Sequence, residues 1–181
     1  MFPESIIILA GEARSGKSST LRELAKKLEK QHGRFIYSFR GKRICICLCS
    51  PQELLSKKNF CEYQKVMAII RDTMIDVCES EKCTLLVMAF TMKGDQKTGE
   101  LLNEPCIETP IRDLKKTFKV HVVYLHKNDS RKKTPRVVER LRRIDDLMRH
   151  LKDYQIESHE GVREERRQAD ELWKIMMEVD P

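Results

Sequence analysis

The residues whose types and spacing could do chemistry lie near the amino end of the chain. They are Gly11, Gly16, Lys17 and Ser18, in the spacing G-x-x-x-x-G-K-S, between an apolar stretch at 5–10 and a helical pattern. Glycines let backbone N–H groups curl around phosphate oxygens, and the start of the following helix presents partial positive charge to an anion. We expect Lys17 to reach the terminal phosphates of a nucleotide and the Ser18 hydroxyl to ligate Mg²⁺.

This segment resembles the Walker A motif, or P-loop, of the P-loop NTPases. The resemblance implies a nucleoside triphosphate, ATP or GTP, bound together with Mg²⁺. The alternative is a glycine-rich turn between a strand and a helix that binds no ligand. The residues expected to contact the nucleotide are Gly11, Glu12, Ala13, Arg14, Ser15, Gly16, Lys17, Ser18 and Ser19.

Composition describes a soluble globular protein. Of 181 residues, 40% are hydrophobic and 35% are charged, and no apolar run approaches the ~20 residues that a membrane span needs. The apolar stretch at 5–10 has no basic segment before it, so we interpret it as a core strand rather than a signal peptide. The seven cysteines lack paired C-x-x-C spacings, which favours buried, reduced thiols over a metal site. Reduced thiols in turn indicate a cytoplasmic location.

Strand and helix patterns alternate along the chain. This order predicts a three-layer α/β fold of the P-loop NTPase type, with a mostly parallel sheet, one antiparallel hairpin and C-terminal helices, in a single domain over 1–181. Ligands of such folds bind at the carboxyl ends of the strands. We expect strands at 5–10, 83–90 and 120–125, a hairpin over 35–49, a polar loop at 91–107, and helices from Gly16 to Gly33, at 60–80, from Thr109 and Pro110 to 118, at 131–152 and at 160–179.

The buried strand that ends at Phe90 carries no acid at its end, where P-loop enzymes usually place a residue that holds Mg²⁺ or activates the nucleophile. The Walker B position is therefore degenerate. Glu53 and Asp95 are the candidate substitutes, and Gln52 could orient a water molecule. The alternative is that each is an ordinary surface residue.

Charge is distributed unevenly near the carboxyl end. Residues 131–152 hold nine Lys or Arg against three acids, whereas residues 153–181 hold four against nine. Arg136, Arg140 and Arg143 share one side of the basic helix, and guanidinium groups suit a phosphoryl group in transfer. The segment resembles the lid of the small P-loop kinases. The alternatives are a solvated basic face that pairs with Glu164, Glu165 or Glu171, and a surface that binds nucleic acid.

The order of elements also resembles that of Ras-like GTPases. His126-Lys127-Asn128-Asp129 stands where those proteins carry the guanine-reading N-K-x-D, with His126 in place of Asn. Pro51-Gln52-Glu53 stands at their second switch, but Leu48 and Pro51 replace the Asp and Gly of its D-x-x-G. The resemblance implies that Asp129 would bond a guanine edge. The alternative is a polar loop after a strand.

These patterns together predict an Mg²⁺-dependent protein that binds a nucleoside triphosphate, with ATP favoured. Its expected activity is kinase-like phosphotransfer to a small molecule or nucleotide, with Lys17, Glu53, Arg136 and Arg140 as catalytic candidates. One alternative is a GTP- or ATP-dependent switch that acts on a protein partner. Another is an ATPase associated with nucleic acid. No membrane partner is expected.

Overall fold

A computed structural model describes residues 2–12, 15–33, 35–48, 60–92, 104–127, 135–158 and 164–179. Within these ranges, the side chains of 60–67, 104–107, 127, 136, 137, 140 and 158 are not described. In chain order the elements are β1 (Ser5–Glu12), α1 (Lys17–Lys26), β2 (Glu29–Lys30), β3 (Ile36–Phe39), β4 (Lys42–Ile46), α3 (Phe60–Glu81), β5 (Leu85–Met92), α4 (Glu104–Thr117), β6 (Lys119–Lys127), α5 (Pro135–Leu151), β7 (Tyr154–Ser158) and α6 (Glu164–Val179).

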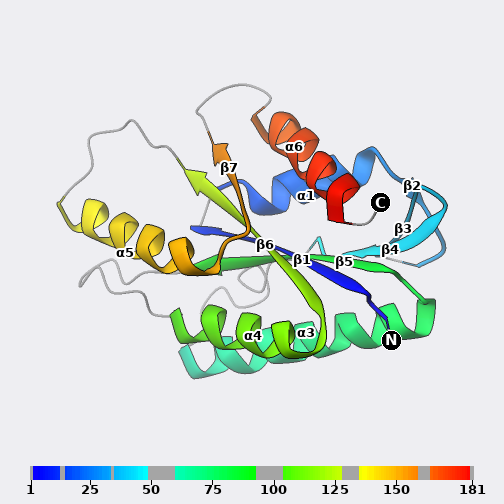
Figure 1. Ribbon diagram of the computed structural model, residues 1–181, viewed down its shortest axis with the longest axis horizontal. Coiled ribbons are helices and arrows are strands. Elements are labelled where there is room, and N and C mark those ends of the chain that lie inside the picture. Colours follow the sequence, from blue (N-terminus) through cyan, green and yellow to red (C-terminus); the bar gives the residue numbers. More distant parts are fainter. Residues whose placement is uncertain are drawn as a thin grey trace.

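A seven-stranded sheet forms the middle layer, with the strand order β2-β3-β4-β5-β1-β6-β7. In the part of the sheet from β4 through β5, β1 and β6 to β7, neighbouring strands are parallel. β3 pairs antiparallel with both β2 and β4. The predicted α/β fold, mostly parallel sheet and hairpin are thereby confirmed. β1 lies between β5 and β6, so its carboxyl end is in the middle of the edge where parallel strands place ligand sites (Figure 1).

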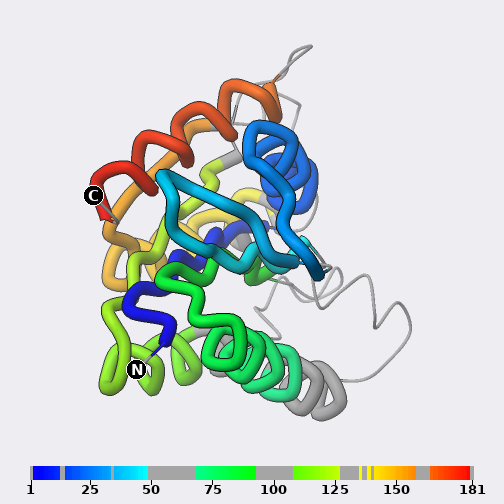
Figure 2. The backbone as a smooth tube through the Cα atoms, turned by 90° about the vertical axis from the view of Figure 1, so that its right-hand side faces the viewer, coloured from blue at the N-terminus to red at the C-terminus, as the bar shows by residue number. Residues whose placement is uncertain are grey.

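Helices cover both faces of the sheet. α1 and α6 lie together on one face, and α3 and α4 lie on the other (Figures 1 and 2). β1 supplies both cores because successive side chains of a strand point to opposite faces. Ile7 and Leu9 join the cluster under α1 and α6, whereas Ile6, Ile8 and Ala10 join the cluster under α3, α4 and α5.

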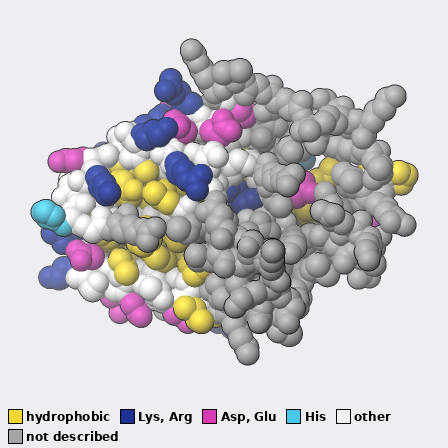
Figure 3. Space-filling model, turned by 180° about the vertical axis from the view of Figure 1, so that it is seen from behind, with side chains coloured by type: hydrophobic (Ala, Val, Ile, Leu, Met, Phe, Trp, Pro, Cys, Tyr) yellow, Lys and Arg dark blue, Asp and Glu magenta, His cyan; other side chains and the backbone are white. Residues whose placement is uncertain are grey.

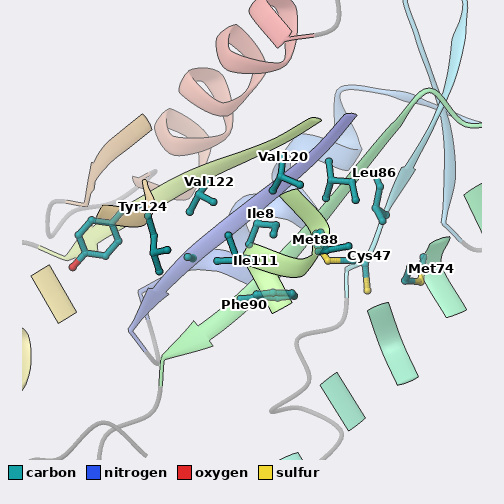
Figure 4. Close-up of a cluster of buried hydrophobic side chains, with 14 of the residues drawn as sticks. Ile8, Cys47, Met74, Leu86, Met88, Phe90, Ile111, Val120, Val122 and Tyr124 are labelled. Carbon is teal, nitrogen blue, oxygen red and sulfur yellow. The ribbon is translucent and has the colours of Figure 1, made fainter. Parts of the chain in front are cut away.

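The cluster under α3, α4 and α5 extends along the sheet to the edge where the parallel strands have their carboxyl ends. Figure 4 shows Met88, Phe90 and Ile111 packed around the middle of the sheet and the Tyr124 ring at one end of the cluster. Cys45 and Cys47 also belong to it, while Ile44 and Ile46 belong to the opposite one. The thiols of Cys45 and Cys47 are buried, as predicted, and they alternate along this strand with Ile44 and Ile46.

Two helix boundaries differ from the sequence prediction. α1 ends at Lys26 rather than at Gly33, because the chain tightens through the bonds Lys27 N–Leu24 O and Leu28 N–Ala25 O and then forms β2. α4 begins at Glu104, so Pro110 lies inside the helix and Thr109 is not its cap. Of the expected loop at 91–107, residues 91 and 92 belong to β5 and residues 104–107 belong to α4, while 93–103 lie outside the described residues.

β7 was not predicted. Its alternation of Tyr154 and Ile156 with polar residues is a short strand signal, and Ile156 is fully buried beneath α6. β7 separates the basic helix α5 from the acidic helix α6, which pack against opposite faces of the sheet. Among the described residues, no helix is both long enough and apolar enough to cross a membrane.

Candidate nucleotide-binding site

The loop between β1 and α1 depends on two glycines. A Cβ atom at Gly11 would lie 2.8 Å from the Leu125 carbonyl oxygen and 2.9 Å from Ser15 Oγ, so a side chain at this position would clash with the end of β6. Gly16 has a φ of 91°, a left-handed conformation that favours glycine, and is the residue that caps α1. The two glycines let the chain turn tightly from the buried strand into the helix.

The amino end of α1 is suited to an anion. Its cap is Gly16, which offers no side-chain hydrogen bond, and no acidic residue lies in the first turn. The regular helical bonding starts with Thr20 N donating to Gly16 O at 2.8 Å. The backbone N–H groups before Thr20 and the positive end of the helix dipole therefore face the loop, which is the arrangement that binds phosphate.

Lys17 lies beneath this loop, with a side chain that is only 4% exposed. Its Nζ donates hydrogen bonds to the carbonyl oxygens of Gly11 (3.0 Å) and Glu12 and to Ser15 Oγ (3.1 Å). Burial lowers the pKa of Lys17 to about 7, and the negative charge of Glu12 opposes that shift. Among the described residues, the hydrogen-bond acceptors of Lys17 Nζ all belong to the loop itself, at the place where the sequence pattern expects the terminal phosphates.

The start of α6 is bonded to the start of α1. Thr20 Oγ1 donates to Gln168 Oε1 at 2.6 Å, and Gln168 Nε2 donates to Glu164 Oε1 at 3.1 Å. Thr20 and Gln168 are both buried, and a Cβ atom at Gly16 would lie 3.2 Å from Gln168 Oε1. Sequence reasoning missed this contact, because a glutamine within an amphipathic helix carries no pattern that points to a partner 148 residues away.

A cavity of about 530 Å³ continues from the loop between the outer faces of α1 and α6. Three of its six lining side chains are basic and two are acidic, so positive and negative charge nearly balance along the cavity. The lining residues are Ser19, Arg22, Glu23, Lys26, Glu165 and Arg166.

The helix α5 is joined to the carboxyl end of β6 by polar contacts. Tyr124 OH donates to Asp145 Oδ1 at 2.8 Å, and His126 Nε2 lies 3.6 Å from the same oxygen. His126 Nδ1 is also 2.8 Å from Glu157 Oε2 of β7. Burial, followed by the bond to Asp145, raises the pKa of Tyr124. These contacts hold the basic helix at the edge of the sheet where β1 ends, with its amino end projecting past the strands (Figure 1).

The structure describes some of the sequence-predicted site residues and not others. Ser18 and Ser19 lie in the first turn of α1, as expected. Arg136 and Arg140 lie in α5, but their side chains are not described, and Arg143 on the same helix pairs with Glu139 at 3.2 Å. Glu164 and Glu171 pair with Arg167 within α6, on the sheet face opposite to α5. Several other candidates lie outside the described residues: Ala13, Arg14, Gln52, Glu53, Asp95, Asn128 and Asp129.

No protein-family model matches the chain, and no curated protein matches it in sequence. Solved structures do match it in fold. A shikimate kinase from Acinetobacter baumannii in complex with shikimate is 13% identical, with a TM-score of 0.55 over 99% of this chain and 96% of the other. An unliganded sugar kinase from Janibacter sp. is 10% identical, with a TM-score of 0.50 over 99% of this chain and 97% of the other. The chain therefore has the fold of the small P-loop kinases.

The described residues beside the start of α1 suit a phosphate group. The buried ammonium of Lys17 and the amino end of α1, whose cap offers no side-chain hydrogen bond, are two separate features that suit a phosphate chain. Within the described ranges, no three His, Cys, Asp or Glu side chains gather into a metal site. Mg²⁺ at a nucleotide site does not require such a group, because it is usually held by one or two protein groups together with phosphate oxygens and water.

Proposed function

We propose that this protein is an Mg²⁺- and ATP-dependent phosphotransferase that acts on a small hydroxylated molecule or a nucleotide. The observation that carries the proposal is the buried Lys17 ammonium, which contacts the carbonyl oxygens of Gly11 and Glu12 and the Ser15 hydroxyl beside the start of α1. Burying a charged lysine costs free energy, and the attraction of a polyanion that binds next to it offsets that cost. The fold supports the same proposal at the level of the whole chain.

In the proposed reaction, the nucleotide phosphates replace the loop's own acceptors. Lys17 exchanges its contacts with Gly11 and Glu12 for phosphate oxygens, and the first N–H groups of α1 donate to the same oxygens. Ser18, in the first turn, offers its hydroxyl to the metal. A metal ion held there would supply positive charge to offset the charge that develops on the transferred group. The chain's own contribution is positioning and electrostatic stabilisation, which dominate phosphoryl transfer.

Arg136 and Arg140 complete the proposal as lid residues. Both lie in the first two turns of α5, which is the end of the helix that projects past the carboxyl ends of the strands (Figure 1). Asp145, further along the same helix, is bonded to Tyr124 and so holds the middle of α5 to the sheet. A guanidinium near the amino end of a helix that is held in this way is well placed to approach a phosphoryl group.

Calorimetric titration with non-hydrolysable analogues of ATP and GTP, with Mg²⁺ present, tests the nucleotide. We expect binding with ATP preferred, and loss of binding in Lys17→Ala. A preference for GTP would instead favour the switch hypothesis and its guanine-reading residue Asp129. No binding of either analogue would overturn the proposal.

Turnover then tests the lid. The acceptor screen should begin with shikimate and monosaccharides, since the similar structures are a shikimate kinase and a sugar kinase, and should include nucleoside monophosphates. Arg140→Ala is expected to lower kcat by at least about tenfold while nucleotide affinity stays largely unchanged. Arg149→Ala is the matched control, because Arg149 is exposed on the last turn of α5 and pairs with Asp146 one turn earlier in the same helix. Equal kcat in the two variants would remove the lid assignment.

A further inference from the structure

A row of polar side chains lies between α5 and the carboxyl ends of β6 and β7. The strand register pairs His126 with Glu157, and His126 follows Tyr124 by two residues, so all three lie on the sheet face that α5 covers. His126 Nδ1 is 2.8 Å from Glu157 Oε2, and His126 Nε2 is 3.6 Å from Oδ1 of Asp145 in α5. The same Asp145 oxygen accepts a hydrogen bond from the Tyr124 hydroxyl at 2.8 Å. One imidazole therefore stands between a carboxylate of the sheet and a carboxylate of the helix.

Asp145 lies where the buried part of α5 begins. Ile144 and Met148 belong to the cluster under α3, α4 and α5, whereas none of the described side chains of α5 before Ile144 is buried. Arg140 precedes Asp145 by little more than one helical turn, because a turn holds about 3.6 residues. The contact of Asp145 with the sheet therefore sets the tilt of the unburied amino half of α5, which carries Arg136 and Arg140.

The two contacts of His126 require two protons on one ring. An ionised carboxylate only accepts hydrogen bonds, so both contacts are attractive only when Nδ1 and Nε2 each carry a hydrogen. A neutral imidazole carries one. In the neutral ring the closer contact, to Glu157 at 2.8 Å, keeps that hydrogen on Nδ1, and the lone pair of Nε2 then faces Asp145. Only the imidazolium attracts β7 and α5 at the same time.

Other charged and polar groups surround this ring and its partners. Lys152, directly after α5, donates to Gln155, and Gln155 donates to Oε1 of Glu157. Lys152 Nζ also lies 5.9 Å from the centre of the Tyr124 ring. Glu12, at the end of β1, shares this sheet face by strand alternation. Among these residue types, histidine is the one that ordinarily gains or loses charge between about pH 5 and 8.

We propose that His126 is a positioning residue whose imidazolium holds the amino half of α5, and with it Arg136 and Arg140, at the nucleotide-binding edge of the sheet. Loss of one proton keeps the bond to Glu157 and removes the attraction to Asp145, so the helix is released as pH rises. For the role of the two arginines, this inference rests on the proposed function.

Two substitutions separate the two ring nitrogens. The amide nitrogen of His126→Gln takes roughly the place of Nε2 and can donate to Asp145 at any pH, whereas that of His126→Asn takes roughly the place of Nδ1 and can donate only to Glu157. His32→Gln is the matched control, because His32 is exposed between β2 and β3. Hydrogen exchange of the α5 amides is measured without nucleotide at pH 6 and pH 8.5, as protection factors relative to those of α3, which also report that each variant is folded.

In the wild type and in His32→Gln, the relative protection of α5 should fall about two- to fivefold from pH 6 to pH 8.5, which corresponds to the loss of one partly exposed ion pair. Protection in His126→Gln should be the same at both pH values. Protection in His126→Asn should stay at or below the wild-type value for pH 8.5. Protection that is independent of pH in the wild type, or that is equal in the two His126 variants, would overturn the proposal.

Turnover then tests the link to the proposed reaction. With saturating nucleotide and acceptor, the kcat of His126→Gln relative to the wild type should rise with pH, whereas the kcat of His126→Asn relative to His126→Gln should be low at every pH. These ratios cancel the pH effect of Lys17, which all the proteins share. Ratios that do not change with pH, beside pH-dependent protection of α5, would contradict a role of His126 in the reaction. The expected protection without any phosphotransfer would instead overturn the proposed function and leave the contact between His126 and α5 intact.

Discussion

At the scale of single residues, Lys17 links nucleotide binding to pH. Its pKa of about 7 in the ligand-free protein reflects burial, and a bound polyphosphate would raise that pKa by adding negative charge. Above pH 7 the bound state then holds more protons than the free state, so binding takes up a proton and weakens as pH rises. We expect affinity for the ATP analogue to fall by up to about tenfold per pH unit above 7.

Calorimetry at pH 8.5, in buffers of different ionisation enthalpy, measures this proton uptake. Lys17→Met should bind weakly and show no uptake from this position. Lys116→Met is the control, since Lys116 is exposed on α4 and pairs with Asp113, and its proton uptake should equal that of the wild type. An observed binding enthalpy that is independent of the buffer in the wild type would contradict the prediction.

At the same scale, the sequence identified the loop correctly but not why it needs its residues. The pattern predicted Gly11 and Gly16, and the structure confirms that both positions require glycine. The clash at Gly11 comes from the Leu125 carbonyl, which belongs to a strand more than a hundred residues away and has no local signal in the sequence. Glu12 was predicted as one of several contacts to the nucleotide, and its pairing with Met92 is set by sheet register rather than by spacing.

At the scale of elements, the bond between Thr20 and Gln168 fixes α6 to the first turn of α1. Both side chains are buried, so Gln168→Leu leaves the Thr20 hydroxyl without its partner and should destabilise the fold by about 1–3 kcal/mol. Thr20→Val should cost a similar amount. The double variant should cost less than the sum, because replacing both partners by apolar groups removes the unpaired group.

Urea denaturation of the four proteins measures this coupling. The same four proteins, titrated with the ATP analogue, show whether the contact also positions the loop: the single variants should bind more weakly, since Gln168 Oε1 lies close to Gly16. Strictly additive losses of stability would contradict the coupling. A coupled loss of stability with unchanged affinity would limit the contact to folding.

Elements with long periodic patterns were predictable, and elements that depend on partners were not. β1, β5, β6, α3 and α5 appear close to their predicted positions because each buries a continuous apolar face. The end of α1 was misjudged because Leu28 is buried after the helix has ended, so burial and helical spacing diverge there. The start of α4 was misjudged because Pro105 and Pro110 both satisfy the preference for proline in a first turn.

At the scale of the whole molecule, alternation of strands and helices was enough to predict a mostly parallel sheet, but not the order of its strands. β5 lies between the hairpin strand β4 and β1, and β7 extends the other edge. The order matters for the site, because it places the carboxyl end of β1 between β5 and β6. The basic helix α5 and the acidic helix α6 lie on opposite faces of the sheet. On the described part of the face in Figure 3, basic and acidic side chains are interspersed and form no continuous basic band.

The two cores share the same central strands, which predicts that the chain unfolds as one unit. Removing either helical layer exposes β1, whose side chains from Ile6 to Ala10 divide between the two clusters. Calorimetry should therefore record a single transition. At 100 times its dissociation constant, the Mg²⁺–ATP analogue should stabilise the wild type by about 2.7 kcal/mol and raise Tm by roughly 5–10 °C. Lys17→Ala should show no such shift. Two separated transitions would mean that the α1–α6 layer and the α3–α5 layer fold independently, and a shift confined to one of them would show which layer the nucleotide stabilises.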